Sequence, residues 1–120
     1  MEQTEPRVAD NPEARRFEIT VDGKVAGFAE YRRHGSRISF IHTEVDPAYE
    51  GRGLGSALVR GALDASRAAG LSVMPYCPFV RDYIARHPGY LDLVPPDRRD
   101  RFSLPTEDER TGESATGLSG

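Results

Sequence analysis

The sequence predicts an α+β fold, in which a mainly antiparallel, twisted sheet carries packed helices in the chain order β-β-β-α-β-α. Three observations predict it. Apolar and polar residues alternate within residues 17–45, which is the period of half-buried strands. From residue 54 the apolar positions change to helical spacing. A short apolar run at 71–74 then precedes a second helical pattern, as expected for a chain that returns to its sheet.

Two turn signals, Asp22-Gly23 and Gly35-Ser36, divide the first part of the chain into three strands. Both central residues of a type I′ hairpin turn need positive φ, which Asp-Gly adopts readily. We therefore expect an antiparallel meander with strands over 17–21, 24–33 and 37–45.

The first helix is predicted from residue 54 to Gly70, because glycine accepts the left-handed conformation that commonly ends a helix. After the strand at 71–74, Pro78 suits the first position of a second helix, which Pro88 ends. A last short strand is expected around residues 91–94.

The chain has 120 residues, enough for one compact core and too few for two. The sequence places this single domain at residues 15–95. Residues 1–14 and 96–120 are rich in proline and charge or in small polar residues, and they lack apolar periodicity. We therefore predict a disordered leader and a disordered tail.

Composition excludes several classes of function. The net charge of −3 provides no electrostatic footprint for nucleic acid, and no apolar stretch is long enough to span a bilayer. One cysteine, Cys77, rules out an internal disulfide, and three scattered histidines lack the paired spacing of a metal site. We expect a cytoplasmic monomer without metal, with no nucleic-acid or membrane partner.

The glycine-rich segment 50–56 holds the main functional signal, because it leads directly into the first predicted helix. The first amides of a helix have no internal partners and point outward at the positive end of its dipole, which favours anion binding. Glycines let a phosphate group approach the backbone, and Arg52 adds a charged donor. A tight turn with close helix packing is the alternative explanation of these glycines.

Two familiar phosphate-binding patterns do not fit this segment. A P-loop needs Lys followed by Ser or Thr after its last glycine, whereas Gly55 is followed by Ser56-Ala57. A dinucleotide fingerprint needs G-x-G-x-x-G, but the glycines here are Gly51, Gly53 and Gly55, and they follow an antiparallel meander.

A third pattern fits. Val45-Asp46-Pro47 followed by 49–59 resembles the acetyl-CoA signature of the Gcn5-related N-acetyltransferase (GNAT) superfamily, Q/R-x-x-G-x-G/A. Gly53 and Gly55 match, whereas Glu50 stands where Gln or Arg is usual. The segments 42–45, 74–80 and 83–90 extend the resemblance to the small YjdJ-type branch, a minimal GNAT-like fold without the usual first helices.

This resemblance covers about residues 16–94 and implies an acetyl-CoA-dependent N-acetyltransferase. It implies a cofactor lying between two diverging strands, with its pantetheine amides near Glu44 and Val45. The residues implied to bind the pyrophosphate are Gly51, Arg52, Gly53, Leu54, Gly55 and Ser56. The acceptor amine, on a small molecule or a protein, is not identified by the sequence.

Transfer of an acyl group to an amine needs a base and a proton for the departing thiolate. His42 is a candidate because imidazole titrates near neutrality, and alternation predicts that it shares a face with Phe40. Glu44 lies two residues further on the same face. Cys77, just before a helix start, is a candidate to bear the acyl group or to line the thioester pocket. A packed histidine, a solvated carboxylate and an inert buried thiol are the structural alternatives.

Two other functions stay open at this point. The first is a CoA-binding module without turnover, a sensor or partner-binding domain, because the truncated scaffold leaves few walls for an acceptor site. The second is a phosphoanion-binding domain unrelated to CoA.

Overall fold

The computed structural model describes residues 5–105. Its elements follow the expected order, with one strand added at the start. The strands are β1 (Arg7–Asn11), β2 (Arg16–Val21), β3 (Lys24–His34), β4 (Arg37–Val45) and β5 (Ser72–Pro75). The helices are α1 (Leu54–Ala68) and α2 (Pro78–Arg86), with short 3₁₀ turns η1 (Pro47–Tyr49), η2 (Pro88–Leu93), η3 (Pro96–Arg98) and η4 (Asp100–Phe102).

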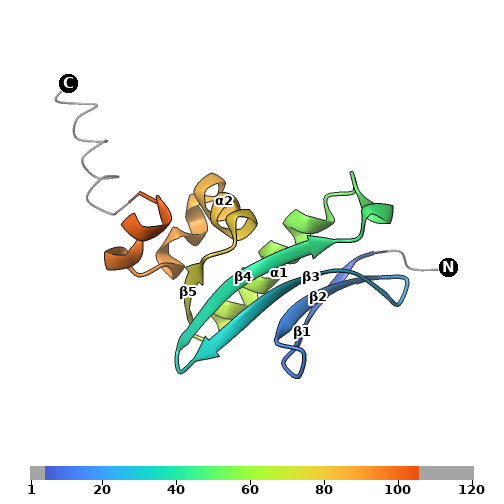
Figure 1. Ribbon diagram of the computed structural model, residues 1–120, viewed down its shortest axis with the longest axis horizontal. Helices are drawn as coiled ribbons and strands as arrows, with labels where there is room; N and C mark the ends of the chain where they lie inside the picture. The colour runs from blue at the N-terminus through green and yellow to red at the C-terminus, as the bar shows by residue number, and fades with distance from the viewer. Residues whose placement is uncertain (1–4, 106–120) are drawn as a thin grey trace.

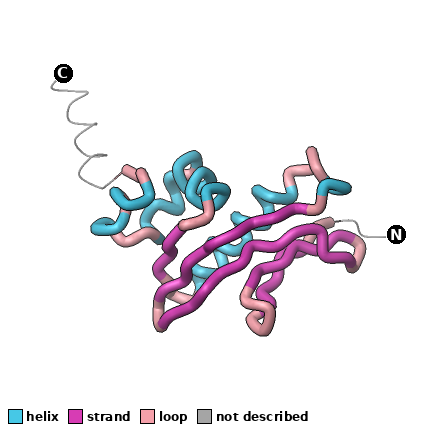
Figure 2. Tube along the Cα trace, in the orientation of Figure 1, coloured by secondary structure: helices cyan, strands magenta, loops and turns pink. Residues whose placement is uncertain are grey.

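The five strands form one sheet in the order β1-β2-β3-β4-β5 (Figures 1 and 2). Strands β1 to β4 are antiparallel neighbours, whereas β4 and β5 are parallel because α1 connects them. The mainly antiparallel α+β fold predicted from the sequence is therefore confirmed. The predicted order of elements lacks one strand, β1, which precedes the others in the chain.

The residues that predict turns and helix ends adopt the expected conformations. Asp22 and Gly23 have φ of 53° and 79°, as a type I′ turn requires. Gly70 has φ of 71° directly after α1, and its amide donates to the Arg67 carbonyl at 3.0 Å. Pro78 occupies the first turn of α2.

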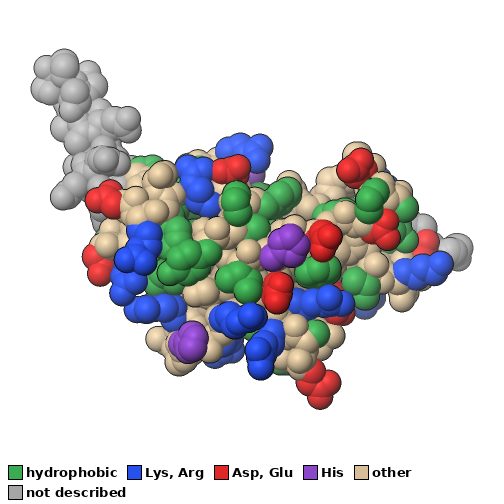
Figure 3. All heavy atoms as spheres, viewed as in Figure 1, with side chains coloured by type: hydrophobic (Ala, Val, Ile, Leu, Met, Phe, Trp, Pro, Cys, Tyr) green, Lys and Arg blue, Asp and Glu red, His purple; other side chains and the backbone are tan. Residues whose placement is uncertain are grey.

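The sheet has one covered and one uncovered face, which we call the helix face and the open face. α1 lies behind the sheet in Figure 1. The helix face carries the apolar core side chains of the strands, among them Phe17, Ile19, Ala29, Tyr31 and Phe40. The open face carries Arg16, Glu18, Phe28, Glu30, His42 and Glu44. In Figure 3 charged side chains of both signs and a histidine gather over the strands on this face.

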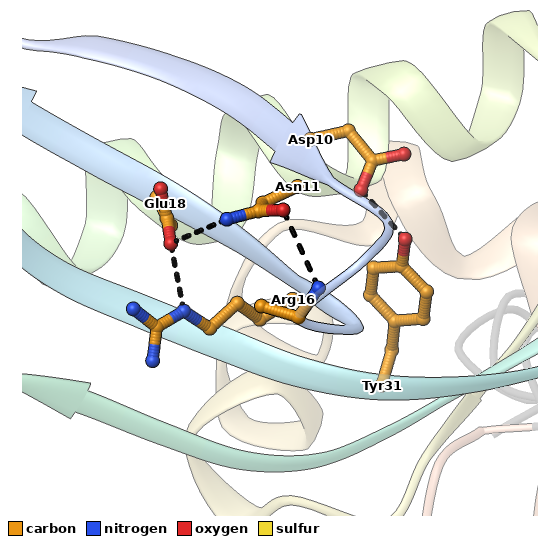
Figure 4. A network of polar contacts seen from close by, with 6 residues as sticks. Asp10, Asn11, Arg16, Glu18 and Tyr31 are labelled. Carbon is orange, nitrogen blue, oxygen red and sulfur yellow. Dashed lines mark hydrogen bonds and ion pairs between the residues drawn. The ribbon is translucent and has the colours of Figure 1, made fainter.

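Strand β1 corrects the prediction of a disordered leader at residues 1–14, since Arg7–Asn11 pairs along its length with β2. The sequence here lacks clear apolar alternation, so only its partners reveal the strand. The Tyr31 hydroxyl donates to Asp10 at 2.6 Å, and the Asn11 amide donates to Glu18 at 3.1 Å (Figure 4). The rest of the leader prediction concerns residues 1–4, which lie outside the described residues, and residues 5–6 and 12–14 beside the strand.

The C-terminal part also differs from the prediction. Residues 91–94 do not form a strand, because η2 is tied to α1: Arg67 donates to Asp92 at 2.8 Å, and Tyr90 donates to Asp64 at 2.7 Å. Residues 96–102 form two short turns instead of a disordered tail, and Phe102 and Leu104 are buried. Residues 106–120 of the predicted tail lie outside the described part.

The contact between Tyr31 and Asp10 should make the free energy of unfolding fall at alkaline pH. Burial, together with the hydrogen bond to Asp10, raises the pKa of Tyr31 to about 12. Because the pKa of Tyr31 in the folded protein lies above its ordinary value, the protonated hydroxyl stabilises the fold fully below about pH 10. This stabilisation is lost as the pH rises through about 12. In Tyr31→Phe, urea unfolding should show a free energy about 1 kcal/mol lower at neutral pH and a smaller fall between pH 10 and 12.

The half-exposed Tyr76 supplies the matched control for this prediction. Within residues 5–105 its hydroxyl makes no hydrogen bond, so Tyr76→Phe should keep the alkaline dependence of the native protein. An equal alkaline fall in native protein and Tyr31→Phe would contradict the assignment.

Candidate active site

The two parallel strands part at the centre of the molecule. Their pairing ends at Phe40 and Pro75, and the Cys77 amide makes the last contact with a 2.8 Å hydrogen bond to the Phe40 carbonyl. Beyond this point the chain after β5 turns into α2, whereas β4 continues to Val45 toward the start of α1 (Figure 1). Within the described chain, residues 41–45 therefore have no partner strand on the β5 side.

A β-bulge in β4 decides which side chains face this gap. Glu30 pairs with His42, but the next residue, Tyr31, pairs with Phe40, so Ile41 is one extra residue in β4. The bulge reverses the alternation, and His42 lies on the open face instead of sharing a face with Phe40. The predicted orientation of His42 is therefore wrong, because simple alternation takes no account of a bulge.

The same bulge turns Thr43 to the helix face, where it pairs with Ala29 of β3. Its hydroxyl lies 3.3 Å from the sulfur of Cys77. No sequence pattern assigns a role to Thr43, because only the bulge, which that pattern does not reveal, places it beside the cysteine.

The glycine-rich loop begins α1 with unpaired amides. Gly51 and Gly53 have φ of 81° and 72°, and an added Cβ at either position would meet no atom within 4 Å. Within residues 5–105, no hydrogen bond is donated by a backbone amide of residues 51–56, and the first α1 bond at this end is Ala57 to Gly53 at 3.1 Å. The backbone thus presents a row of free donors at the positive end of a helix that is 15 residues long.

The third glycine of the loop has a packing role. A Cβ on Gly55 would lie 2.6 Å from the ring of Phe79, which is 43% exposed and comes from α2. The close-packing explanation therefore holds for Gly55, whereas the open space at Gly53 leaves the backbone accessible. Arg52 lies with its guanidinium 5.3 Å from the centre of the Tyr49 ring, beside the free amides.

His42 and Glu44 form a pair on the open face. The Nε2 atom of His42 lies 3.4 Å from Oε1 of Glu44, and the two side chains are 56% and 62% exposed. The ring of Phe28 lies 6.0 Å from the imidazole, centre to centre. This exposure excludes both the packed-histidine alternative and the shared face with Phe40, and it leaves the imidazole accessible from solvent.

An open pocket of about 380 Å³ adjoins this pair. Its lining includes Arg16, Phe28, Glu44 and Asp46. Arg16 is already engaged, since its guanidinium lies 4.5 Å from the centre of the Phe28 ring and its Nε donates to Glu18 at 2.8 Å. In the described chain, the side chain that contacts the Glu44 carboxylate is that of His42, at 3.4 Å.

Cys77 lies on the opposite side of β4 from His42. It precedes Pro78 as the N-cap of α2, as the sequence predicts, and its side chain is buried. The structure therefore places the three predicted catalytic residues around one strand without bringing them into mutual contact: His42 and Glu44 meet on the open face, and Cys77 meets Thr43 on the helix face.

Three tyrosines near α2, Tyr76, Tyr83 and Tyr90, could donate a proton to a departing thiolate, and their surroundings differ. Tyr90 donates to Asp64, and burial together with this bond raises the pKa of Tyr90 to about 12, which disfavours proton release. Tyr83 is buried and stacks on His87 at 4.0 Å. Tyr76 is half exposed and packs edge-on against Phe102.

Residues 5–105 show neither of two further features. This part of the chain contains no group of three or more potential metal ligands. It also contains no helix with the length and apolar character needed to cross a membrane.

The antiparallel meander, the glycine-rich entry to α1 and the parting of β4 from β5 together define an acetyltransferase-type α+β protein. Residues 16–93 match the family model described as GCN5-related N-acetyl-transferase, which is more than half of the chain. The chain belongs to the GCN5-related N-acetyltransferase family. The predicted superfamily is thus confirmed, while the YjdJ-type branch stays a prediction.

Individual relatives agree with this family. The chain is 32% identical over 101 residues to Protein NATD1 of Mus musculus, covering 80% of this chain and 92% of that protein. A GCN5-like protein from Staphylococcus aureus, described as a candidate N-acetyltransferase, shares the fold with a TM-score of 0.57 and 21% identity over 78% of this chain and 90% of that chain.

A third similarity is partial. The ribosomal-protein-S18-alanine N-acetyltransferase from Escherichia coli is 30% identical over 48% of this chain, with a TM-score of 0.46. The match spans 38% of that enzyme.

Proposed function

We propose that this protein transfers an acetyl group from acetyl-CoA to an amine of an acceptor. The observation that supports this proposal most is the row of free amides at residues 51–56, because they begin α1 beside the gap between β4 and β5. Diphosphates are favoured ligands of such a helix start. The family of the chain consists of N-acetyltransferases, which agrees with this use of the loop.

In the proposed complex, different parts of acetyl-CoA bind to the loop and to the edge of β4. The amides from Gly51 to Ser56 and the guanidinium of Arg52 would bind the pyrophosphate, and the unpaired edge of β4 near Glu44 and Val45 would bind the pantetheine amides. Acetyl-CoA supplies an activated thioester when bound. With the thioester in the gap, Cys77 would lie on one side of β4 and His42 on the other.

In this proposal, the acceptor binds on the open face of the sheet. A protonated amine must lose its proton before it can attack, and His42 is exposed on this face with Glu44 beside it. His42 is proposed as the base, and Glu44 as the carboxylate that orients the imidazole or receives the proton in its place. Cys77 is proposed either to bear the acetyl group or to line the thioester pocket.

Two measurements test the proposal. A saturable thermal shift with acetyl-CoA and acetyl-CoA-dependent release of CoA thiol with an amine are the expected results. If neither acetyl-CoA nor longer acyl-CoAs shift the melting temperature, the proposal fails. Displacement of CoA by ATP would instead indicate a general phosphoanion site.

A CoA-binding module without turnover is the second candidate function. The uncovered open face favours it, because the walls that would hold an acceptor are few and both His42 and Glu44 are largely exposed. The two candidates share the cofactor site and differ in chemistry. Steady thiol release with any amine would exclude the second.

Replacing Cys77 separates its two proposed roles. Cys77→Ala should remove any thioester-linked acetyl group that mass spectrometry finds on the native protein after mixing with acetyl-CoA, since the chain has one cysteine. If the sulfur bears the acetyl group, kcat should fall by about 100-fold or more. Cys77→Ser is the matched variant that keeps the size of the side chain. Full activity in Cys77→Ala would exclude the covalent route.

A further inference from the structure

The sulfur of Cys77 has a defined polar partner. The side chain is 4% exposed, and its thiol donates a hydrogen bond to the Thr43 hydroxyl over 3.3 Å. The two residues are 34 positions apart in the chain, so the contact depends on the packing of α2 and β5 against β4. Within residues 5–105, Thr43 is the one side chain that hydrogen-bonds to this sulfur.

The bulge at Ile41 creates this contact. If β4 paired regularly through Ile41, without a bulge, alternation would place His42 on the helix face toward Cys77 and Thr43 on the open face. With the bulge, Thr43 lies on the helix face. Threonine is branched at Cβ and therefore stiff about χ1, so its hydroxyl direction is set by the backbone of β4.

Cys77 is thus fixed by two neighbouring parts of one strand. The backbone amide donates to the Phe40 carbonyl at 2.8 Å, before the bulge, and the thiol contacts Thr43 after it. These contacts lie where β4 and β5 part. A change at Thr43 would free the sulfur to rotate while leaving the backbone anchor in place.

We propose that Thr43 is a positioning residue, which orients the Cys77 sulfur toward the gap between β4 and β5 for acetyl transfer. This inference rests on the proposed function. In the proposed transfer, the Cys77 sulfur forms a bond to the acetyl carbon, the bond from that carbon to the CoA sulfur breaks, and the thiol proton passes to the departing CoA sulfur. The Thr43 hydroxyl accepts from the thiol in the resting protein, and by rotating it donates to the sulfur once that proton has left. Thr43 acts through Cys77 and needs no contact with the acetyl group.

The first test needs no enzymatic activity. Because the chain has one cysteine, the infrared S–H stretching band of the full-length protein reports the hydrogen bond of Cys77 alone. In Thr43→Val, which removes the hydroxyl and keeps the branched shape, the band should move to higher frequency. Thr43→Ser should restore it. Thr20→Val, the same exchange on strand β2, is the matched control and should leave the band unchanged.

The second test asks whether Thr43 acts through Cys77. Thr43→Val should lower kcat roughly five- to tenfold, the size of one lost hydrogen bond, with the dissociation constant of acetyl-CoA unchanged. Thr43→Ser should recover most of the rate. In a Cys77→Ala background the same substitution should have no further effect, as a double-mutant cycle detects.

The outcomes separate this inference from the proposed function. Absence of acetyl-CoA-dependent turnover in the native protein contradicts the proposed enzyme, whereas an unchanged S–H band in Thr43→Val overturns the contact itself. Native kcat in Thr43→Val, or an equal loss of rate with and without the cysteine, overturns the positioning role.

Discussion

Substitution of Gly53 by tryptophan should reduce the affinity for acetyl-CoA about 100-fold or more while the protein stays folded. Gly53 lies at the start of α1 with φ of 72° and open space around its missing Cβ. An indole there would cover the free amides of residues 51–56, and each lost charge-assisted hydrogen bond to a phosphate is worth more than a neutral one. Titration calorimetry with acetyl-CoA measures the effect.

Gly35 provides the matched control. It has φ of 60°, and an added Cβ would also meet nothing within 4 Å, but it precedes β4 whereas the loop follows this strand. Gly35→Trp should therefore show the same backbone strain, on the order of 1–2 kcal/mol, with native affinity for the cofactor. Unchanged affinity in Gly53→Trp would remove the loop from the proposed site.

Removal of the imidazole of His42 should lower kcat about 100-fold or more, the usual contribution of a general base. The side chain is 56% exposed, so His42→Ala leaves no buried cavity and should melt at nearly the native temperature. Because the cofactor is proposed to bind backbone groups of β4 and of residues 51–56, whereas the His42 side chain lies on the open face, its affinity should not change. Steady-state thiol release with an amine, at saturating acetyl-CoA, measures the effect.

His34→Ala is the control for this prediction, since His34 is an exposed histidine at the end of β3, where it pairs with Arg37. It should keep native kcat. Added imidazole should partly restore His42→Ala because the position is open to solvent. Native turnover in His42→Ala would reject the histidine as base and leave Glu44 as the remaining candidate on the open face.

Several turns and helix ends of this protein depend only on residues that are close together in the sequence. Asp22-Gly23 predicts its turn because the required positive φ belongs to those two residues, and Gly70 and Pro78 mark helix ends for similarly local reasons. The glycine-rich entry to α1 is visible for the same reason, since a helix start and its free amides adjoin each other in the sequence.

Features that depend on partners distant in sequence were missed. Strand β1 has little apolar pattern of its own and is held by Tyr31 and Glu18 of other strands. Phe102 and Leu104 are surrounded by polar and charged residues in the chain, yet they are buried. Local composition predicts disorder for β1 and for the segment around Phe102, because composition contains no information on the apolar surface that is buried by packing against distant residues.

The sequence by itself determined the mainly antiparallel sheet, the order from β2 to α2 and the glycine-rich start of α1, all of which follow from periodicity and backbone preference. Only the tertiary structure decided on which side of β4 each reactive group lies. The single extra residue Ile41 turns His42 to the open face and Thr43 toward Cys77. A bulge is selected by pairing with β3 and by packing against the helices, so its position is set by contacts that the sequence pattern does not contain.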